Sequence, residues 1–270
     1  MIKKILLTLG ALVTLGVTVI TVLGILANNP YELEPERLGP KGDETIPPIV
    51  AVRNAKNYLL YPAHAENIYV IHLPLPNHYI HESNTTGRIL KSYSVSASMY
   101  YPELNGKFYP GNANLPNCNG YCGGYVRVFI EPNQNTAHVM NEHVLERIKH
   151  DRQQDSPLLK FEGLDPEFGI GEHFQIRYPA IEAKSKGAKG STKEYLIKRD
   201  GNGEVEYMFE CSPYAPSPAC GVKFNLSSRP ELVVDIRFGR DLMSNWQNII
   251  QSVDAKIASW RPTRIEIAKK

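Results

Sequence analysis

The sequence predicts an α+β protein of antiparallel sheets with a C-terminal amphipathic helix, following an N-terminal transmembrane helix. Residues 5–27 are apolar and carry no charge. From about residue 67 onward, short stretches alternate apolar with polar side chains and are separated by Pro and Gly, as in half-buried strands. Residues 241–260 repeat apolar side chains at helical spacing.

The apolar segment 5–27 is long enough to cross a membrane. As a helix its 23 residues span about 35 Å, more than a bilayer core of about 30 Å. A cleaved signal peptide is the alternative, but its apolar region is shorter and ends in a small-x-small site. Here Ile25 stands where a small residue is preferred, so we expect an uncleaved anchor. No Cys lies near Ala27, which argues against a lipoprotein.

The flanking charges predict the orientation of this anchor. Lys3 and Lys4 precede it, and acidic residues outnumber basic ones after it. Because positive flanks stay cytoplasmic, residues 1–4 form a cytoplasmic tip and the rest is translocated. We therefore expect a single-pass inner-membrane protein with its C-terminal domain in the periplasm. Residues 28–48, with five prolines and seven charges, are expected to form an extended stalk.

Residues 49–160 are expected to form a first α+β lobe. Alternation predicts strands over 67–73, 91–101 and 125–130. The clearest strand, 91–101, places five side chains on one face: Tyr93, Val95, Ala97, Met99 and Tyr101. Residues 136–152 space Met140, Val144 and Ile148 one turn apart, which predicts an amphipathic helix.

Residues 161–270 are expected to form a second lobe. The turn from Asp200 to Gly203 predicts a hairpin, because Gly and Asn accept positive φ at little cost. Strands are predicted over 195–198, 204–209, 222–226 and 232–238. The final helix, 241–260, has Asp241 as its expected N-cap and one apolar stripe: Leu242, Trp246, Ile249, Ile250, Val253 and Ile257. Both halves run from a Cys-bearing loop to an Arg-containing strand and a helix, an order consistent with two related lobes.

Four cysteines are placed to form two local disulfides. Cys118 is followed by Cys122, and Cys211 by Cys220. In an oxidising compartment, such bridges close short loops and restrict the unfolded chain. Three connectivities remain open, and a bridge between the two halves is the alternative to local pairing.

No sequence pattern predicts a catalytic residue, a metal site or a cofactor. His72, His78 and His81 lie close in sequence, but their Pro-rich surroundings favour a surface loop over a metal site. The acidic turn at Asp200 lacks the later acidic ligand of a calcium loop. No nucleophile elbow, phosphate-binding loop or His-Glu-x-x-His motif occurs.

The charge balance argues against nucleic-acid binding. The formal net charge is only +2, whereas nucleic-acid binders carry a strong basic excess. One lysine cluster lies in a Gly/Ser-rich stretch and comprises Lys184, Lys186, Lys189 and Lys193. It is expected to be a solvated loop. Alternatively Lys186 and Lys189 contact an acidic protein partner or anionic lipid headgroups.

Residues 207–260 resemble the C-terminal end of the proteins of a known family. The stretch runs from Tyr207 through Cys211, a Pro-containing loop and Cys220 to an Arg-bearing strand and a helix that contains Trp246. That order is similar to periplasmic immunity proteins of type VI secretion effector–immunity pairs. The resemblance implies a non-enzymatic protein that binds a secreted antibacterial toxin and neutralises it by occlusion.

The interface of such an inhibitor is expected to come from loops held by the sheets. Tyr121 and Tyr214 lie in two loops that the expected disulfides close, and each offers apolar area with a hydroxyl. The alternative is that both rings pack beneath their own loops. Two other functions remain open: an accessory subunit of a bacterial envelope complex, and an unrecognised periplasmic hydrolase whose His and carboxylate groups converge from distant segments.

Overall fold

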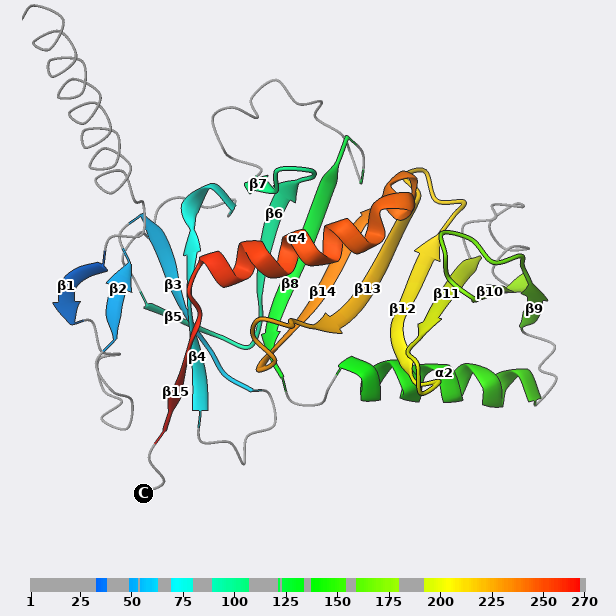
Figure 1. The fold of residues 1–270 in the computed structure, drawn as a ribbon, viewed down its shortest axis with the longest axis horizontal. Helices are drawn as coiled ribbons and strands as arrows, with labels where there is room; N and C mark the ends of the chain where they lie inside the picture. The colour runs from blue at the N-terminus through cyan, green and yellow to red at the C-terminus, as the bar shows by residue number, and fades with distance from the viewer. Residues whose placement is uncertain are drawn as a thin grey trace, which may run out of the picture.

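A computed structural model gives the fold (Figure 1). It describes residues 33–37, 49–52, 54–62, 69–79, 89–106, 121, 123–133, 137–153, 159–179 and 192–267. The expected transmembrane segment, 5–27, lies outside these residues. None of the described helices combines the length and apolarity that a membrane crossing requires.

A nine-stranded antiparallel sheet is the largest element of the fold (Figure 1). Its strands, in spatial order, are β7 (Asn105–Gly106), β6 (Val95–Tyr100), β8 (Tyr125–Pro132), β14 (Leu232–Gly239), β13 (Ala219–Asn225), β12 (Val205–Ser212), β11 (Lys193–Arg199), β10 (Glu172–Arg177) and β9 (Lys160–Gly163). Strand β8, from the first expected lobe, pairs along its length with β14 from the second. The expected boundary near residue 160 therefore falls within one continuous sheet.

Two smaller sheets lie beside the large one. The four-stranded sheet has the order β15 (Thr263–Glu266), β4 (Tyr69–Pro76), β3 (Ala55–Leu60) and β5 (Ile89–Ser92). Its β3–β5 pair is parallel, unlike the other pairs of the described sheets. Strand β1 (Leu33–Arg37) pairs with β2 (Val50–Val52), so part of the expected stalk joins a sheet.

Helix α4 (Trp246–Ser259) covers one face of the large sheet (Figure 1). The predicted helical stripe is confirmed for five of its six residues, because Trp246, Ile249, Ile250, Val253 and Ile257 are all buried. The sixth, Leu242, lies before the helix and is only partly buried. The five buried residues join the inward side chains of β6, β8, β12, β13, β14 and β4 in the main hydrophobic cluster. Burying so many apolar side chains in one cluster is the main source of stability for such a fold.

Helix α2 (Ala137–Gln153) packs on the opposite face of the large sheet, against β12 and β13. This confirms the helix predicted over 136–152. Its Leu145 and Ile148 join a second hydrophobic cluster with side chains of β10, β11 and β12. Met140, expected on the buried stripe, is instead exposed at the N-terminal end of the helix.

Two local expectations were wrong. The strand predicted over 91–101 is interrupted near Tyr93, whose ring is 67% exposed, because the chain leaves the smaller sheet at Ser92 and enters the large sheet at Val95. Asp241 does not cap the last helix. It lies in a 3-10 turn, η4 (Arg240–Asn245), and α4 begins only after Asn245.

A buried histidine fixes the middle of the smaller sheet. His72 lies on β4, and its Nε2 is 3.0 Å from the side-chain oxygen of the buried Asn57 on β3. That oxygen also accepts the backbone N–H of Val52 at 3.1 Å. Since Asn57 Oδ1 can only accept, Nε2 of His72 donates to it. Burial lowers the pKa of His72 to about 4.

The buried His72 predicts an acid-sensitive fold. In the unfolded chain its pKa is 6.5, so the unfolded state binds more protons than the folded state between pH 6.5 and pH 4. Stability is therefore full above 6.5 and falls as the pH decreases toward 4. The unmodified protein should become less stable between about pH 7 and pH 5, and His72 should account for about 2 kcal/mol of that decrease. We expect this part of the decrease to be absent from His72→Gln.

The measurement is the urea unfolding free energy of both proteins at these two pH values. The matched control is His150→Gln, because His150 lies on α2 with its side chain 68% exposed. Equal pH dependence in His72→Gln and the unmodified protein would contradict the assignment.

Candidate functional site

The end of the β12–β13 hairpin is closed by a disulfide. Cys211 and Cys220 face each other across the two strands and are bonded, which confirms one of the two predicted local bridges. Both are fully buried, and the turn of residues 213–218 projects beyond them. We call residues 211–220 the hairpin end. Its base cannot open, because the disulfide and the strand ladder both hold it.

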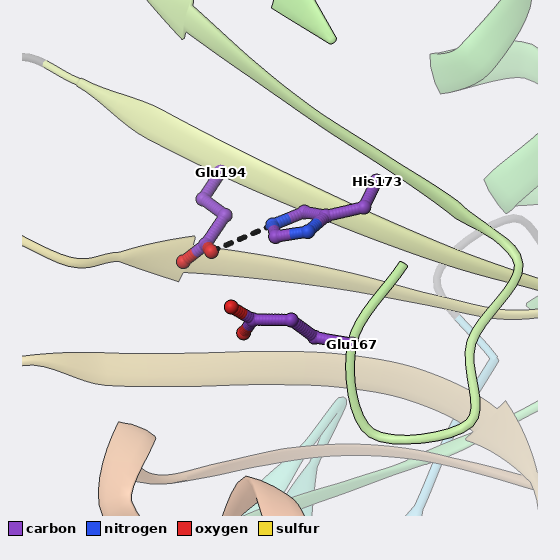
Figure 2. A group of neighbouring side chains, drawn as sticks. All are labelled: Glu167, His173 and Glu194. Carbon is purple, nitrogen blue, oxygen red and sulfur yellow. Dashed lines mark hydrogen bonds and ion pairs between the residues drawn. The ribbon is translucent and has the colours of Figure 1, made fainter. Parts of the chain in front are cut away.

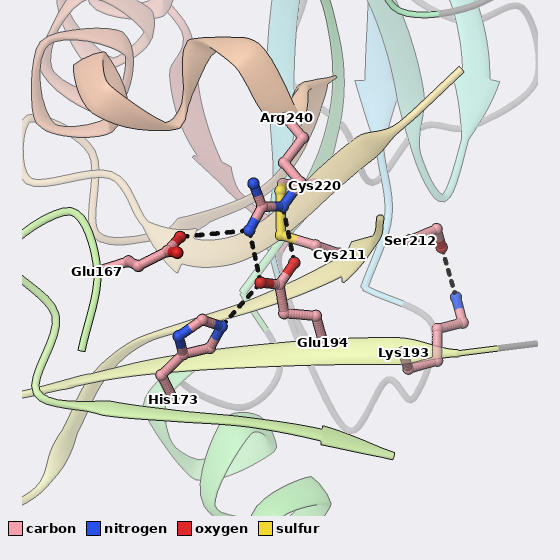
Figure 3. The surroundings of a disulfide bond; sticks show 8 residues. All are labelled: Glu167, His173, Lys193, Glu194, Cys211, Ser212, Cys220 and Arg240. Atoms are coloured by element: carbon pink, nitrogen blue, oxygen red, sulfur yellow. Dashed lines mark hydrogen bonds and ion pairs between the residues drawn. A yellow bond between two sulfur atoms is a disulfide. The ribbon is translucent and has the colours of Figure 1, made fainter. Parts of the chain in front are cut away.

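A buried group of charged side chains lies beside this disulfide (Figures 2 and 3). Glu194, on β11, has its side chain 4% exposed and accepts from Arg240 at both oxygens, at 2.8 and 2.6 Å. The same carboxylate is 2.7 Å from Nε2 of His173 on β10. Glu167 lies 3.3 Å from Arg240 at the exposed rim. We call these four residues the charge cluster.

The hydrogen bonds indicate the protonation of His173. Its Nδ1 is 2.6 Å from the backbone oxygen of Asp165, which can only accept, so Nδ1 carries a proton. Its Nε2 faces Glu194, whose two oxygens also receive the guanidinium of Arg240. With Glu194 ionised, Nε2 is placed to donate as well, so both ring nitrogens of His173 are engaged as donors.

The same contacts keep Glu194 ionised although it is buried. Burial alone would raise its pKa, but the hydrogen bonds and positive charges of Arg240 and His173 outweigh burial and lower it. Breaking such a group by removing one partner leaves a charge in the interior without compensation. The charge cluster therefore joins β10, β11 and the start of η4 electrostatically.

A hollow of about 690 Å³ opens over the charge cluster. His173, Glu194 and Arg240 line its floor, and Tyr214 and Pro218 of the hairpin end line its wall. The backbone N–H of Arg240 donates to the carbonyl of Pro218 at 3.0 Å, which ties the turn to the cluster. We call this the first hollow.

A second hollow, of about 530 Å³, lies on the other side of the hairpin end. It is lined by Tyr121, by Met140 of α2 and by Ser217 of the turn. The backbone N–H of Tyr121 donates to the hydroxyl of Ser217 at 2.8 Å. The structure thus brings together the two loops in which the sequence predicted partner contacts, although they are far apart in the chain.

The two tyrosines of these loops differ in exposure. Tyr214 is 49% exposed at the tip of the turn. Tyr121 is half-buried, with its ring centroid 5.7 Å from that of Tyr125. Tyr214 is thus open to solvent, whereas Tyr121 lies partly against the sheet; that either residue contacts a partner stays a prediction.

Glu167, His173 and Glu194 have the donor types of a metal site, and their ligand atoms lie within 4.8 Å of one another (Figure 2). The surrounding contacts do not fit a metal ion. The guanidinium of Arg240 already holds both oxygens of Glu194, and both ring nitrogens of His173 donate hydrogen bonds. For the same reason no nitrogen of His173 is free to accept a proton as a general base.

The other residues singled out from the sequence fall into two groups. Cys118, Cys122, Lys186, Lys189 and His81 lie outside the described residues. His72 and His78 are described but do not form a common site: His72 is buried against Asn57, and His78 is half-buried in the 3-10 turn η1 (Asn77–Tyr79). The surface-loop expectation is therefore wrong for His72, because it lies within a central strand of its sheet.

The charge cluster was missed from the sequence. Its members come from four separate segments, and no spacing connects them. One signal was present: Glu194 interrupts an apolar side of a strand, since Leu196, two residues further on the same face, is buried. A carboxylate at a buried strand position requires a cationic partner.

The charge cluster predicts a large stability loss when its centre is neutralised. Glu194→Gln leaves Arg240 with only the exposed Glu167 and His173 without its carboxylate partner. We expect a loss of about 3 kcal/mol in the urea unfolding free energy, at the low end for broken buried ion pairs because Arg240 is partly exposed.

The matched control is Glu210→Gln on the neighbouring strand. Glu210 pairs with Lys193 at 2.7 Å, with side chains 46% and 36% exposed. Its loss should cost less than about 1 kcal/mol, because exposed pairs contribute little. Similar losses in both variants would show that Glu194 has no special role.

No protein-family model matches the chain. No curated protein matches it either. A solved structure is similar: Smlt3025, an immunity protein of the Stenotrophomonas maltophilia type IV secretion system, with 11% identity and a TM-score of 0.48. The match covers 83% of this chain and 100% of that protein. The secretion system in that description is type IV, so the comparison does not support the type VI system that the sequence predicted.

Proposed function

We propose that this chain is an immunity protein that binds a secreted antibacterial protein toxin and blocks its active site. One observation carries the proposal: the disulfide-closed hairpin end projects Tyr214 between two hollows. The projecting turn can enter a cleft of the partner, and the two hollows beside the turn can receive the rims of that cleft. Residues 207–260, which resemble type VI immunity proteins, contain this hairpin end.

The construction of the hairpin end suits an inhibitor. Binding costs less conformational entropy when the binding loop is already ordered. Here the disulfide holds the base, Arg240 donates to Pro218, and Ser217 contacts Tyr121. An aromatic side chain on a rigid turn is also a favoured anchor of protein interfaces.

The polar groups in the first hollow support binding rather than catalysis. Each of His173, Glu194 and Arg240 is engaged by another member of the charge cluster or by the backbone. A hydrolase would need a nucleophile or a base that is free to take a proton. The charge cluster is instead arranged to hold the floor of the hollow in one conformation.

The location belongs to the same proposal. Disulfides form and persist in oxidising compartments, and the Cys211–Cys220 bridge supports a translocated domain. We place this domain in the periplasm, held to the inner membrane by residues 5–27. Delivery of the toxin by type VI secretion is the finer part of the proposal and rests on the resemblance of residues 207–260.

The proposal predicts that a gene for a secreted toxin lies beside this gene, and the test uses that toxin. That toxin is expressed in the bacterial periplasm, alone and together with the full chain. Co-expression should restore growth, and the two purified proteins should form a complex that blocks the toxin's activity. No rescue and no complex would refute the immunity function. Recovery of envelope machinery from membranes without toxin would favour the accessory-subunit alternative.

The hairpin end predicts where toxin affinity is lost. We expect Tyr214→Ala to weaken toxin binding at least about tenfold without changing the melting temperature, since the ring is half exposed and lies at the tip. Tyr93→Ala is the matched control, because Tyr93 is 67% exposed but lies between β5 and β6. Both are measured by titration calorimetry and thermal unfolding. Equal affinities for the two variants would exclude Tyr214 from the interface.

A further inference from the structure

The outer face of the large sheet, opposite α4, carries two adjacent arginines. Arg127 on β8 and Arg237 on β14 are directly opposite each other in the strand register, so they point to the same face. Ser98 of β6 continues the row, because it lies opposite Arg127. Arg127 is exposed, and the side chain of Arg237 is 54% exposed.

This arrangement is unfavourable for the fold alone. Like charges directly opposite in an antiparallel pair repel each other. Arg237 has Asp235 at 3.5 Å, whereas no carboxylate among the described residues forms an ion pair with Arg127. The pair therefore has an excess of positive charge, which a binding partner can neutralise.

One aromatic side chain, Phe129, contacts both arginines. The guanidinium of Arg127 lies 4.7 Å from the ring centroid of Phe129, and that of Arg237 lies 5.5 Å from the same centroid. A guanidinium that stacks on a ring keeps its N–H edges available for a carboxylate. The rigid planar fork is thus positioned before any partner arrives.

Tyrosines extend this surface toward the hairpin end. The ring of Tyr125 lies 5.7 Å from the rings of both Tyr100 and Tyr121, and its hydroxyl is 2.9 Å from that of Ser98. Tyr121 and Arg237 together line the second hollow. We call the following residues the arginine face: Ser98, Tyr100, Tyr125, Arg127, Phe129 and Arg237.

We infer that the arginine face binds an acidic segment of a protein partner. Arg127 and Arg237 donate hydrogen bonds to the carboxylates of that segment. Arg and Tyr are the residue types most enriched at interface centres, and the excess charge selects an acidic partner. The inference rests on the proposed function only in taking the toxin to be that partner. Nucleic acid is disfavoured, because the formal net charge of the chain is only +2.

The test measures binding of short fluorescein-labelled peptides to the full chain in mild detergent at physiological ionic strength. One peptide alternates Glu with Gly, and its neutral match alternates Gln with Gly. The Glu peptide should bind by fluorescence polarisation and the Gln peptide should not. Arg127→Gln with Arg237→Gln should weaken binding of the Glu peptide at least about tenfold.

Arg264→Gln is the matched control. Arg264 also stacks on an aromatic ring, 4.1 Å from the centroid of Tyr69, but it lies on β15 and donates to Glu266 at 2.7 Å. Its replacement should leave peptide binding unchanged. Thermal unfolding reports whether each variant is folded, and the single arginine variants are used if the double variant is not.

Three outcomes would overturn the inference: no binding of the Glu peptide, equal binding by the double variant, or tighter binding of a single-stranded DNA oligonucleotide. A separate measurement of toxin binding distinguishes failure of this inference from failure of the proposed function. If the toxin binds the double variant as tightly as the unmodified protein, the arginine face is excluded and the immunity function remains. If the Glu peptide binds but the toxin does not, the arginine face remains and the immunity function fails.

Discussion

The buried carboxylate of Glu194 is the constraint on which the functional end of the molecule depends. A carboxylate in this position stays ionised only because Arg240 and His173 both donate to it. Arg240 is the first residue of η4, which leads into α4, whereas His173 and Glu194 belong to strands near the edge of the large sheet. One charge group therefore fixes the start of the last helix against the far strands of the sheet.

The position of Arg240 connects this interior constraint to the surface. Its side chain enters the charge cluster while its backbone N–H holds Pro218 of the hairpin end (Figure 3). The disulfide below that turn fixes the strand ends from which the turn projects. Rigidity of the hairpin end thus comes from the core, through hydrogen bonds and a covalent bond, and does not require a large apolar cluster of its own.

The two faces of the large sheet next to the hairpin end have different chemistry. On the α4 side, the first hollow is rimmed by Asp165, Glu167 and Asp241, and its one guanidinium is already paired. On the opposite side, Arg127 and Arg237 give excess positive charge. A strand alternates its side chains between these faces, so adjacent residues of one strand contribute to surfaces with different charged groups. Such a contrast gives a bound partner one preferred orientation.

Local patterns were enough to predict the elements that bury one face. The stripe of α4 and the alternation of β8 and β13 follow from periodicity, because these elements bury one residue per helical turn or every second residue. Strands β12 and β14 bury adjacent residues as well. Periodicity failed where the chain moves from one sheet to another, as at Tyr93. It also missed β10 and β15, which are short and mostly polar.

The candidate functional site could be predicted from the sequence only in part. The disulfide of the hairpin end was predictable, since Cys211 and Cys220 are near each other in sequence and flank a turn. The charge cluster was not, because Glu167, His173, Glu194 and Arg240 meet only after β9 to β14 have paired in order. Sequence shows that Glu194 interrupts a buried strand and therefore needs a cation. Which cation reaches it is decided by the register of the sheet and by the turn that starts η4.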